Sequence, residues 1–406
     1  MLIEIHIIQN HSPNNLNRDD LGAPKTCYFG GVLRSRISSQ AIKRSIRTSA
    51  ELQDLLGGVR TRRLAELIAK EVNGDSKAQK RAETILSDYC GFKLKKARGG
   101  KEEEDEGGEE DTARGGEQSK ALVYTTYNAV QEMARLLQDS GGKTDTKLAE
   151  EFAKLIAERT VAPDMALSGR MLEPDRSATK LWKPLNTTVE AALQVAHAIS
   201  THEARPEVDY YVAKDDIPGD DAGAGYVDEA MFASACFYKY FSIHWEQLVS
   251  NLRGNKELAA HTVGAFIRGA ALVNPTGKQN SFAAHNPPDG ILIEVRNTPI
   301  SYANAFANPV AQGNRDVISQ SIAQLGQYAH DLDTGYGKPQ HRFWFSPNLH
   351  YPLAVQITAE ENEKKKQQEL ALTENNIKSL GELVTAVIGA VGYDWEAVQK
   401  IVVNQR

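Results

Sequence analysis

The chain has 406 residues, 41% of them hydrophobic and 25% charged, and a formal net charge of −6. This length excludes a single small module and favours two domains, or one domain with large insertions. No run of 18 apolar residues occurs, and the N-terminus lacks the basic start and cleavage site of a secretory signal, so we expect a cytoplasmic protein without a membrane span. The three cysteines, Cys27, Cys90 and Cys236, are far apart, which argues against a disulfide framework and a thiolate zinc site.

The charge is distributed unevenly along the chain. Residues 101–111 (KEEEDEGGEED) hold eight acids and one lysine, so the rest of the chain carries a net charge of +1. Residues 25–50 contain six basic residues and no acid. A basic segment on a nearly neutral body is a candidate contact surface for a polyanion, and a solvated basic face is the simpler alternative.

The N-terminal residues alternate as a half-buried strand does. In residues 2–9 (LIEIHIIQ), isoleucines alternate with Glu4 and His6. A loop rich in Asn, Asp, Gly and Pro follows at 10–26, and RSRI at 34–37 is predicted to be a short strand.

A helix is predicted to begin next, because Ser38 or Ser39 suits the N-cap position. Residues three and four apart share a helix face, so this helix combines an apolar seat with a basic flank. The apolar seat consists of Ile42, Ile46 and Ala50, and the basic flank of Lys43, Arg44 and Arg47.

Residues 58–165 are helical in pattern and strongly charged, with helices predicted at 76–90, 121–138 and 145–160. The Gly-rich acidic segment 95–118 cannot bury enough apolar surface to become ordered, so we predict a disordered loop. An acidic mimic of nucleic acid is the functional alternative for this segment.

The second half of the chain mixes strands and helices. Residues 167–171 (LSGRM) indicate a strand with its glycine near a ligand or bend, and residues 191–200 a helix or an apolar strand. Residues 207–214 and 217–225 are predicted to be one arm and the tip of a long hairpin. Strands are further predicted at 231–243 and 291–296, helices at 244–252, 255–273, 316–332 and 375–391, and a charged connector at 360–372.

The two similar amphipathic strands at 2–9 and 291–296, with helices between the strands, favour an α+β fold. The pieces inserted between these strands are predicted to form subdomains. Ferredoxin-like units are the natural candidate for the sheet, although such a fold analogy says little about function by itself.

Six sequence blocks occur in the order found in one known family. They are HSPNNLNRDD (11–20), FGG (29–31), RSRISSQAIKRSIR (34–47), ALSGRM (166–171), AHAISTHEARPEVDYYVAKDD (196–216) and SYANAF (301–306). Together they resemble the backbone subunit of the type I-E CRISPR surveillance complex, the CasC family of Cascade, over most of residues 1–310. RISSQAIKRSIR is the most specific block, whereas the acidic loop near residue 100 and the tail beyond about 335 look individual to this chain.

The resemblance implies an RNA-recognition-motif-like (ferredoxin-like) palm, a helical fingers insertion and a long β-hairpin thumb. It divides the chain into a first palm part at 1–57, fingers at 58–165, palm again at 166–200, the thumb hairpin at 201–230, a final palm part at 231–335, and a C-terminal extension with a charged linker and a helix at 336–406.

The resemblance also implies several copies stacked head to tail along one CRISPR guide RNA, in a ribonucleoprotein of antiviral defence. The expected partners are the guide RNA, the target DNA strand paired to it, further copies of the chain, and the large, small, end-capping and guide-processing subunits. Base pairing, not protein, then reads the foreign DNA. We expect no cofactor, no metal and no enzymatic activity.

A guide of any sequence must be held, so contacts to phosphates are expected rather than contacts to base edges. The resemblance places such contacts at Arg18, Lys25, Lys43 and Arg47, with Arg44 nearby. Free N–H groups at a helix start favour an anion, so Ser38, Ser39 and Gln40 complete a predicted phosphate cradle. The alternative is that a serine only caps the helix and that the cations are solvated.

A flexible side chain is expected to pack between bases of the guide. Met171 follows Gly169 and Arg170, and in the resembling family a methionine here wedges between bases. A thioether is polarizable and packs on any base without reading it. An ordinary core methionine is the alternative.

Two aromatic residues stand on the first arm of the predicted hairpin. In the resembling family this arm folds over the guide of the neighbouring copy, so the resemblance implies that Tyr210 and Tyr211 meet that guide. An aromatic ring suits this role because it stacks on any base. Packing within the hairpin is the alternative for Tyr211. Lys278, in the block GKQNSFAAHNP, is expected to reach a phosphate or to be solvated.

Two other functions compete with this interpretation. Related type III backbone subunits cut RNA with an acidic residue in a palm loop, and Asp19 and Asp20 could hold a Mg2+ that activates water, although adjacent Asp residues also suit a turn. His197 and His202 are five apart and do not match a zinc pair four apart, and His197 is predicted to be a satisfied core residue. The third possibility is a monomeric, generic RNA-binding protein, which assembly with RNA would distinguish.

Overall fold

The computed structural model describes residues 1–53, 55, 57–95, 118–119, 122–213, 226–311, 316–361, 364–373 and 377–401. They fold into two compact units, each assembled from separate stretches of the chain. Unit 1 comprises residues 1–51, 194–244 and 263–400, and unit 2 comprises residues 52–193, 245–262 and 401–406. Most of the predicted disordered loop at 95–118 and the predicted hairpin tip at 217–225 lie outside the described residues.

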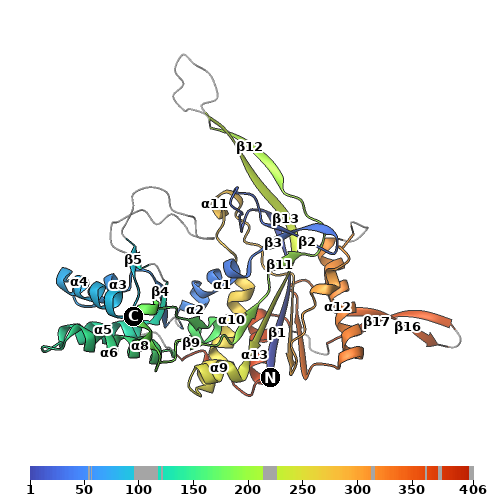
Figure 1. The fold of residues 1–406 in the computed structure, drawn as a ribbon. Coiled ribbons are helices and arrows are strands. Elements are labelled where there is room, and N and C mark those ends of the chain that lie inside the picture. The colour runs from blue at the N-terminus through green and yellow to red at the C-terminus, as the bar shows by residue number, and fades with distance from the viewer. Residues whose placement is uncertain are drawn as a thin grey trace, which may run out of the picture. The chain divides into compact units, whose positions relative to one another are not determined.

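Unit 1 is built around strand β1 (Leu2–Asn14), which lies between β13 (Tyr226–His244) and β14 (Gly290–Arg296) (Figure 1). Both neighbours run antiparallel to β1. The strands predicted in these three regions are therefore confirmed, and the two amphipathic strands noticed in the sequence are direct neighbours. β1 continues into the predicted loop because its residues up to Asn14 still pair with β13.

The sheet extends on both sides of this centre, and every named pair in it is antiparallel. Its order is β15 (His341–Phe345), β14, β1, β13, β11 (Ala198–Ser200), β3 (Val32–Ile37) and β2 (Thr26–Phe29). The strand predicted at 34–37 is confirmed as β3. The segment 191–200, predicted to be a helix or a strand, forms the short strands β10 (Leu193–Val195) and β11.

Both faces of β1 are covered, so the prediction of a half-buried strand is wrong. Glu4 and His6 have no exposed surface. On their side of the strand, Ile8 belongs to a buried cluster with Leu325 of helix α12 (Val317–Tyr336). The polar residues of β1 therefore depend on partners inside unit 1, because a buried polar group without a hydrogen bond is costly.

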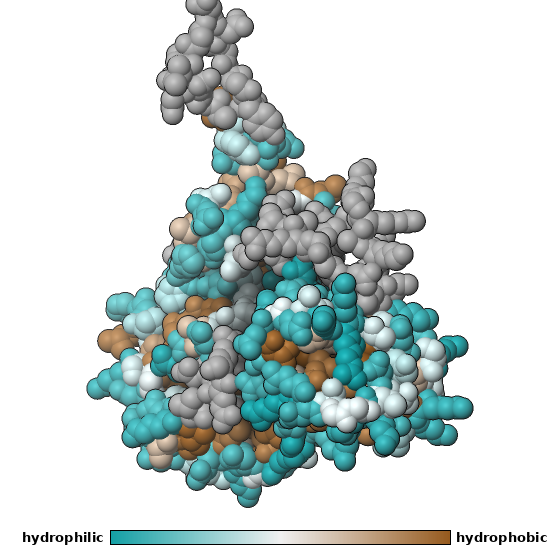
Figure 2. Space-filling model, turned by 90° about the vertical axis from the view of Figure 1, so that its left-hand side faces the viewer, coloured by the Kyte–Doolittle hydropathy of each residue, from teal (hydrophilic) through white to brown (hydrophobic). Residues whose placement is uncertain are grey.

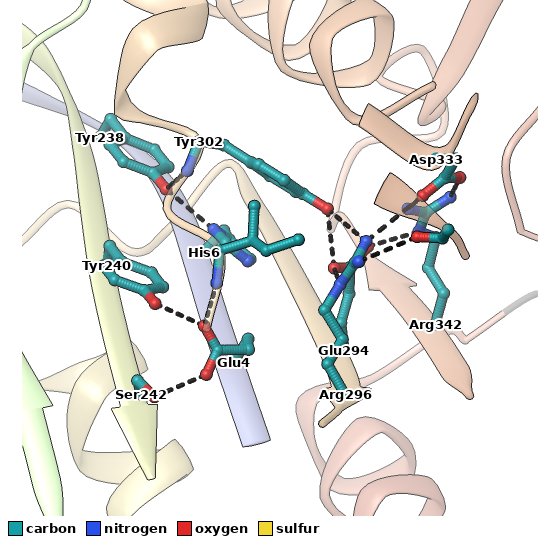
Figure 3. A network of polar contacts seen from close by, with 12 residues as sticks. Glu4, His6, Tyr238, Tyr240, Ser242, Glu294, Arg296, Tyr302, Asp333 and Arg342 are labelled. Atoms are coloured by element: carbon teal, nitrogen blue, oxygen red, sulfur yellow. Dashed lines mark hydrogen bonds and ion pairs between the residues drawn. The ribbon is translucent and has the colours of Figure 1, made fainter. Parts of the chain in front are cut away.

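Glu4 and His6 find these partners on β13 (Figure 3). The carboxylate of Glu4 accepts hydrogen bonds from Oγ of Ser242, at 2.6 Å, and from the hydroxyl of Tyr240. Nδ1 of His6 lies 2.8 Å from the hydroxyl of Tyr238. A distant strand thus supplies partners for the Glu4 carboxylate and for Nδ1 of His6, whereas Nε2 of His6 is buried without a hydrogen-bond partner among the described residues.

Two acids and two arginines close the network on the β14–β15 side (Figure 3). Glu294 lies 2.6 Å from Nε of Arg296 and 2.6 Å from Nε of Arg342. Asp333 of α12 lies 2.7 Å from Nη1 of Arg342 and 3.3 Å from Nη2 of Arg296. Each buried charge is therefore paired with opposite charges, the arrangement in which buried ions are tolerated.

The helix predicted after residue 37 is α1 (Ser39–Arg47), with Ser38 as its N-cap. Ile42 and Ile46 are buried as predicted. Ala50 is exposed, because α1 ends at Arg47 and Ala50 begins the separate short helix α2 (Ala50–Gln53). The basic side of α1 is considered below with its neighbours.

The prediction of a charged connector at 360–372 is wrong. This region forms an antiparallel hairpin of β16 (Ala354–Glu361) and β17 (Lys364–Ala371) (Figure 1). The predicted helices at 255–273, 316–332 and 375–391 are confirmed with shifted ends. The remaining elements of this part of the chain are α10 (Lys256–Leu272), α11 (Gln279–Phe282), η3 (Ala303–Phe306), α13 (Leu380–Ala390) and α14 (Trp395–Val398).

Unit 2 is mainly helical and packs around its own core, which includes Ile68, Met133 and Phe152. The predicted helix at 121–138 begins as a strand, β7 (Val123–Thr126), which pairs with β4 (Gly58–Thr61). The other elements of unit 2 include α3 (Leu64–Glu71), α4 (Ser76–Thr84), η1 (Ile85–Tyr89), β5 (Leu94–Lys95), β6 (Gln118–Ser119), α5 (Tyr127–Gln138), α6 (Asp145–Glu158), α7 (Pro163–Ser168), β8 (Arg170–Met171), η2 (Arg176–Ala178), α8 (Thr179–Trp182), β9 (Thr188–Val189) and α9 (Trp245–Asn251).

Among the described residues, no helix combines the length and the apolar character needed to cross a membrane.

Candidate nucleic-acid interface

The loop between β1 and β2 is tied to the start of α1. Oδ1 of Asn17 accepts a hydrogen bond from the N–H of Ser38 at 2.8 Å. The N–H of Lys25 donates to the carbonyl of Asn17 at 2.9 Å, and the N–H of Arg36 donates to the carbonyl of Lys25 at 2.8 Å. The loop that carries Arg18 and Lys25 therefore has a fixed position beside β3 and α1.

The three residues of the predicted cradle are placed differently at the start of α1. Oγ of Ser38 accepts a hydrogen bond from the N–H of Ala41 at 3.3 Å, so Ser38 is the N-cap. Ser38 and Ser39 are both buried, whereas Gln40 is exposed. Gln40 is therefore the member of the cradle whose side chain is open to solvent.

The basic residues of α1 lie along its outer side. Arg44 is exposed, and Lys43 and Arg47 are half-buried. Lys43 and Arg47 are one turn apart, so both lie on the same face of the helix. Arg18, in the loop joined to α1 by Asn17, is also exposed, whereas Lys25 is 7% exposed.

Arg34 belongs to the basic segment of the sequence but not to its exposed surface. Its side chain is fully buried and donates to the carbonyls of Phe29, Ser200 and Phe306, at 3.2, 3.0 and 2.8 Å. Burial lowers the pKa of its guanidinium. Arg34 therefore holds β2, β11 and η3 together. It is buried, so it does not belong to the exposed contact surface that the sequence predicted.

Arg36 and His197 form a contact that the sequence did not reveal. Nη1 of Arg36 lies 3.0 Å from Nδ1 of His197, and Nε of Arg36 donates to the carbonyl of Thr26 at 3.3 Å. His197 is exposed, so the prediction of a core histidine is wrong. Burial of part of the ring, followed by the charges of Arg36, Lys25 and Lys43, lowers the pKa of His197. The charges of three cations from separate segments thus act on one imidazole.

One of the two acidic residues of the same loop, Asp19, stabilises its turn. Oδ1 of Asp19 accepts hydrogen bonds from the N–H groups of Leu21 and Ala23, both at 2.9 Å. Asp20 is exposed. In the part of the chain that the structure describes, no three His, Cys, Asp or Glu side chains gather as a metal-binding group.

The predicted hairpin consists of β12 (Glu207–Ala213) paired with the first part of β13 (Figure 1). Tyr210 is 71% exposed, and Val208 and Val212 on the same face of β12 are also exposed. Tyr211 lies on the other face, and its hydroxyl donates to Oδ2 of Asp228 at 2.9 Å. Figure 2 shows hydrophobic residues among hydrophilic ones on this hairpin.

The loop that carries Lys278 lies beside the base of this hairpin. The ring of Phe282 lies 5.8 Å from that of Phe232 on β13. Gly277 approaches the β1–β2 loop so closely that a Cβ on it would lie 2.6 Å from the carbonyl oxygens of Asn15 and Leu16. Lys278 itself is half-buried. Unit 1 therefore brings together the β1–β2 loop, the Lys278 loop and the hairpin base.

The remaining predicted contacts are in unit 2. Gly169 has a φ of 73°, and a Cβ on it would lie 2.9 Å from the carbonyl oxygen of Val189. Arg170 is buried and donates to the carbonyl of Ile156 at 2.5 Å, and burial lowers its pKa to about 10. Met171 is 69% exposed. The turn thus holds Arg170 inside unit 2 and leaves Met171 outside, which argues against the core alternative for Met171.

Comparison with known proteins identifies a family that the chain matches. The profile of the family described as CT1975-like protein matches residues 3–374. This match extends past residue 335, so the tail up to residue 374 is not individual to this chain. No curated protein matches the chain.

Two solved structures resemble the chain over nearly its whole length. One is a chain of a "CRISPR RNA-guided surveillance complex, pre-nicking", with a TM-score of 0.74, 28% identity, and coverage of 96% of this chain and 100% of that chain. The other is a chain of a "CRISPR RNA-guided surveillance complex", with a TM-score of 0.67, 25% identity and the same coverage. The α+β fold with a large antiparallel sheet is thus shared with these chains.

Proposed function

We propose that this chain, which belongs to the CT1975-like protein family, is a subunit of a CRISPR surveillance complex. In this proposal the subunit binds the sugar–phosphate backbone of the guide RNA. The resemblance of the sequence to the CasC family is confirmed by the family match and by the two similar structures. Both of those structures are RNA-guided complexes, which supports RNA as the ligand of this chain.

The observation that carries the proposal is the contact of Arg36 with His197, in which Nη1 of Arg36 lies 3.0 Å from Nδ1 of a ring whose pKa is also lowered by the charge of Lys43. In the described residues, Arg36 and Lys43 form no ion pair with an acid. The positive charges of Arg36 and Lys43 therefore repel one another, so a polyanion that lies across these two residues is favoured. Contacts of this kind hold phosphates and carry no information about base sequence.

The fold supports a division of labour within the subunit. In our proposal the sheet of unit 1 is the RNA-recognition-like palm, the helices of unit 2 are the fingers, and the β12–β13 hairpin is the thumb. Tyr210 and Met171 are exposed and unspecific in what they pack on, which suits contacts with bases of any identity. Gln40, Arg18, Arg44, Arg47 and Lys278 complete the proposed RNA contacts.

Several copies are proposed to bind one RNA head to tail. Such an interface does not close on itself, so the length of the RNA and the subunits at its ends set the number of copies. The paired target DNA strand then lies along the same row of subunits, read by the guide and not by the protein.

We also propose that the chain does not cut nucleic acid. Asp19, the candidate metal ligand, accepts two backbone hydrogen bonds through Oδ1, a role that a turn alone explains. Asp19→Asn plus Asp20→Asn should leave RNA integrity unchanged when the complex is incubated with Mg2+ and target RNA. Cleavage by the wild type that disappears in this variant would support the ribonuclease instead.

The central test is the variant Lys43→Ala plus Arg47→Ala. It should weaken binding to single-stranded RNAs of every sequence alike, and reduce the salt slope of log K by about 1–2 units, at roughly 0.7 for each lost contact. Lys70→Ala plus Lys77→Ala removes the same charge from exposed positions of unit 2 and serves as the control. A loss confined to certain RNA sequences would contradict phosphate binding.

Assembly gives a second readout of the same proposal. Complexes purified with guides of different lengths should differ in mass by whole copies of this chain. A constant mass across guide lengths would contradict assembly along the RNA and favour a monomeric RNA-binding protein.

A further inference from the structure

We infer that His197 is a further phosphate-contacting residue of the RNA interface, and that it takes up a proton when RNA binds. This inference rests on the proposed function, because it assigns to that interface a residue and a form of regulation. Its basis is the position of the ring beside Arg36.

The hydrogen bond between Arg36 and His197 determines which form of the ring is present in the free protein. A guanidinium can only donate, so Nδ1 of His197 must accept the hydrogen bond from Nη1 of Arg36 at 3.0 Å. The ring is therefore neutral, with its proton on Nε2. No described residue contacts Nε2 through a hydrogen bond, and the ring is exposed. The neutral ring thus already offers one donor to a ligand.

The charged groups around the ring explain why it stays neutral. Arg36 lies on β3, Lys25 precedes β2 and Lys43 lies on α1, and all three charges disfavour a fourth one on His197. Cys27 lies near Arg36, and burial raises the pKa of its thiol, so it adds no negative charge at neutral pH. Among the described residues, no ion pair with an acid neutralises Arg36 or Lys43 beside the ring.

The backbone around His197 keeps the ring in this place. His197 lies between β10 and β11, and the N–H of Ala196 donates to the carbonyl of Tyr240 at 3.0 Å. Ile199 of β11 is the register partner of Arg36 on β3. His197 therefore directly precedes the strand that pairs with the strand of Arg36, and their spacing follows from the sheet.

A phosphate changes this balance. Its negative charge offsets Arg36, Lys25 and Lys43, and its oxygens accept hydrogen bonds from Arg36 and from Nδ1 of a protonated ring. Nδ1 then gains a proton from solvent and donates to the phosphate, while Nη1 of Arg36 exchanges its acceptor from Nδ1 to a phosphate oxygen. Because binding favours protonation, protonation must favour binding to the same extent.

The direction in which RNA affinity changes with pH follows from this linkage. The pKa of His197 is lower in the free protein than in the RNA complex, so RNA affinity rises as the pH falls through the range between the two values. One linked proton changes the affinity by at most about tenfold per pH unit. We expect a rise of about three- to tenfold between pH 7.5 and 5.5 from this residue.

The test compares the full-length chain with His197→Gln, using a single-stranded oligouridine RNA at fixed ionic strength. Glutamine keeps an oxygen to accept from Arg36 and an N–H to donate, but it does not titrate. Calorimetry in two buffers with different ionisation enthalpies gives the number of protons taken up on binding. His350→Gln, at an exposed position of unit 1, is the matched control.

The wild type and His350→Gln should take up the same fraction of a proton near pH 6.5, and His197→Gln should take up less and lose the corresponding rise in affinity. Equal proton uptake and equal pH dependence in all three would overturn the role of His197 while leaving RNA binding in place. If none of the three bound RNA at low salt, the proposed function itself would fall.

Discussion

Asn17 is joined to Ser38 by a hydrogen bond of 2.8 Å from the N–H of Ser38 to the side-chain oxygen of Asn17. The carbonyl of the same Asn17 accepts from the N–H of Lys25. One residue therefore sets the position of the loop that carries Arg18 relative to the first turn of α1. The proposed interface depends on this spacing, because phosphates along one RNA strand are regularly spaced.

Asn17→Ala should lower both stability and RNA affinity. It leaves the N–H of Ser38 without its acceptor in a buried place, which costs about 1–3 kcal/mol of the free energy of unfolding. The freed loop should weaken binding of all RNA sequences. Asn17→Asp keeps an acceptor and is the control for stability, measured by urea unfolding. Unchanged unfolding and affinity in Asn17→Ala would show that the hydrogen bond does not organise the interface.

Tyr210 should matter for binding and not for folding. Its ring is 71% exposed, so Tyr210→Ala should change the free energy of unfolding by less than about 0.5 kcal/mol. In the assembled complex it should cost about 1–3 kcal/mol of RNA binding, the value of one lost base stack. Tyr210→Phe keeps the ring and should bind like the wild type. Full RNA affinity in Tyr210→Ala would contradict the proposed contact between this ring and a base.

The sequence predicted where the basic surface lies, but it did not predict correctly which residues belong to that surface. Charge can be read from residues 25–50, but burial cannot. Arg34 is covered because the carbonyls of Ser200 and Phe306, far away in the sequence, converge on it. His197 joins the surface because β11 pairs with β3. No local pattern around either residue contains that information.

The fold shows the same division between local and distant information. Periodicity predicted β1 and α1, because each pattern lies within the element itself. The alternation of Glu4 and His6 with isoleucines also predicted an exposed face, which is wrong since their partners come from β13. Likewise the charged run at 360–372 gave no sign of the β16–β17 hairpin, whose strands are held by backbone pairing.

Arg342 should be essential for the stability of unit 1. Arg342→Met removes the guanidinium that Glu294 and Asp333 share, and leaves Arg296 as the cation that both buried acids contact, with the hydroxyl of Tyr302 still donating to Glu294. Removing one partner of a buried ion pair costs about 3–5 kcal/mol. Arg205→Ala removes an exposed pair with Glu203 and should cost less than about 1 kcal/mol. Similar losses in both variants, measured by urea unfolding, would contradict the importance of burial.

The same network predicts a response to acid. Burial raises the pKa of Glu294, but Arg342, His6 and Arg296 more than offset this, so the net pKa lies below its usual value. A carboxyl with a lowered pKa in the folded state stabilises the fold above about pH 4.5 and loses this effect as the pH falls further. Arg342→Met should therefore lose less stability than the wild type on acidification below pH 4.5. An equal loss in both proteins would show that Arg342 does not hold this pKa down.

Lys239 on β13 should make stability rise with pH above neutrality. It is 2% exposed, its Nζ donates to Oδ1 of Asn274 at 3.3 Å, and burial lowers its pKa to about 7. The unfolded chain keeps this amine protonated up to about pH 10. Between pH 7 and 10 the unfolded state therefore binds more protons than the folded state, and the free energy of unfolding increases with pH by up to about 1.4 kcal/mol per unit.

Lys239→Met fills the same space without a charge, so it should remove this rise and be relatively more stable at pH 7 than at pH 9. Lys70→Met, at a position whose side chain is 67% exposed, should keep the pH dependence of the wild type. Urea unfolding at pH 7, 8 and 9 measures the difference between the variants, in which the titration of other groups cancels. Parallel curves for wild type and Lys239→Met would mean that the amine is charged in the folded protein, with a partner or water that compensates for its burial.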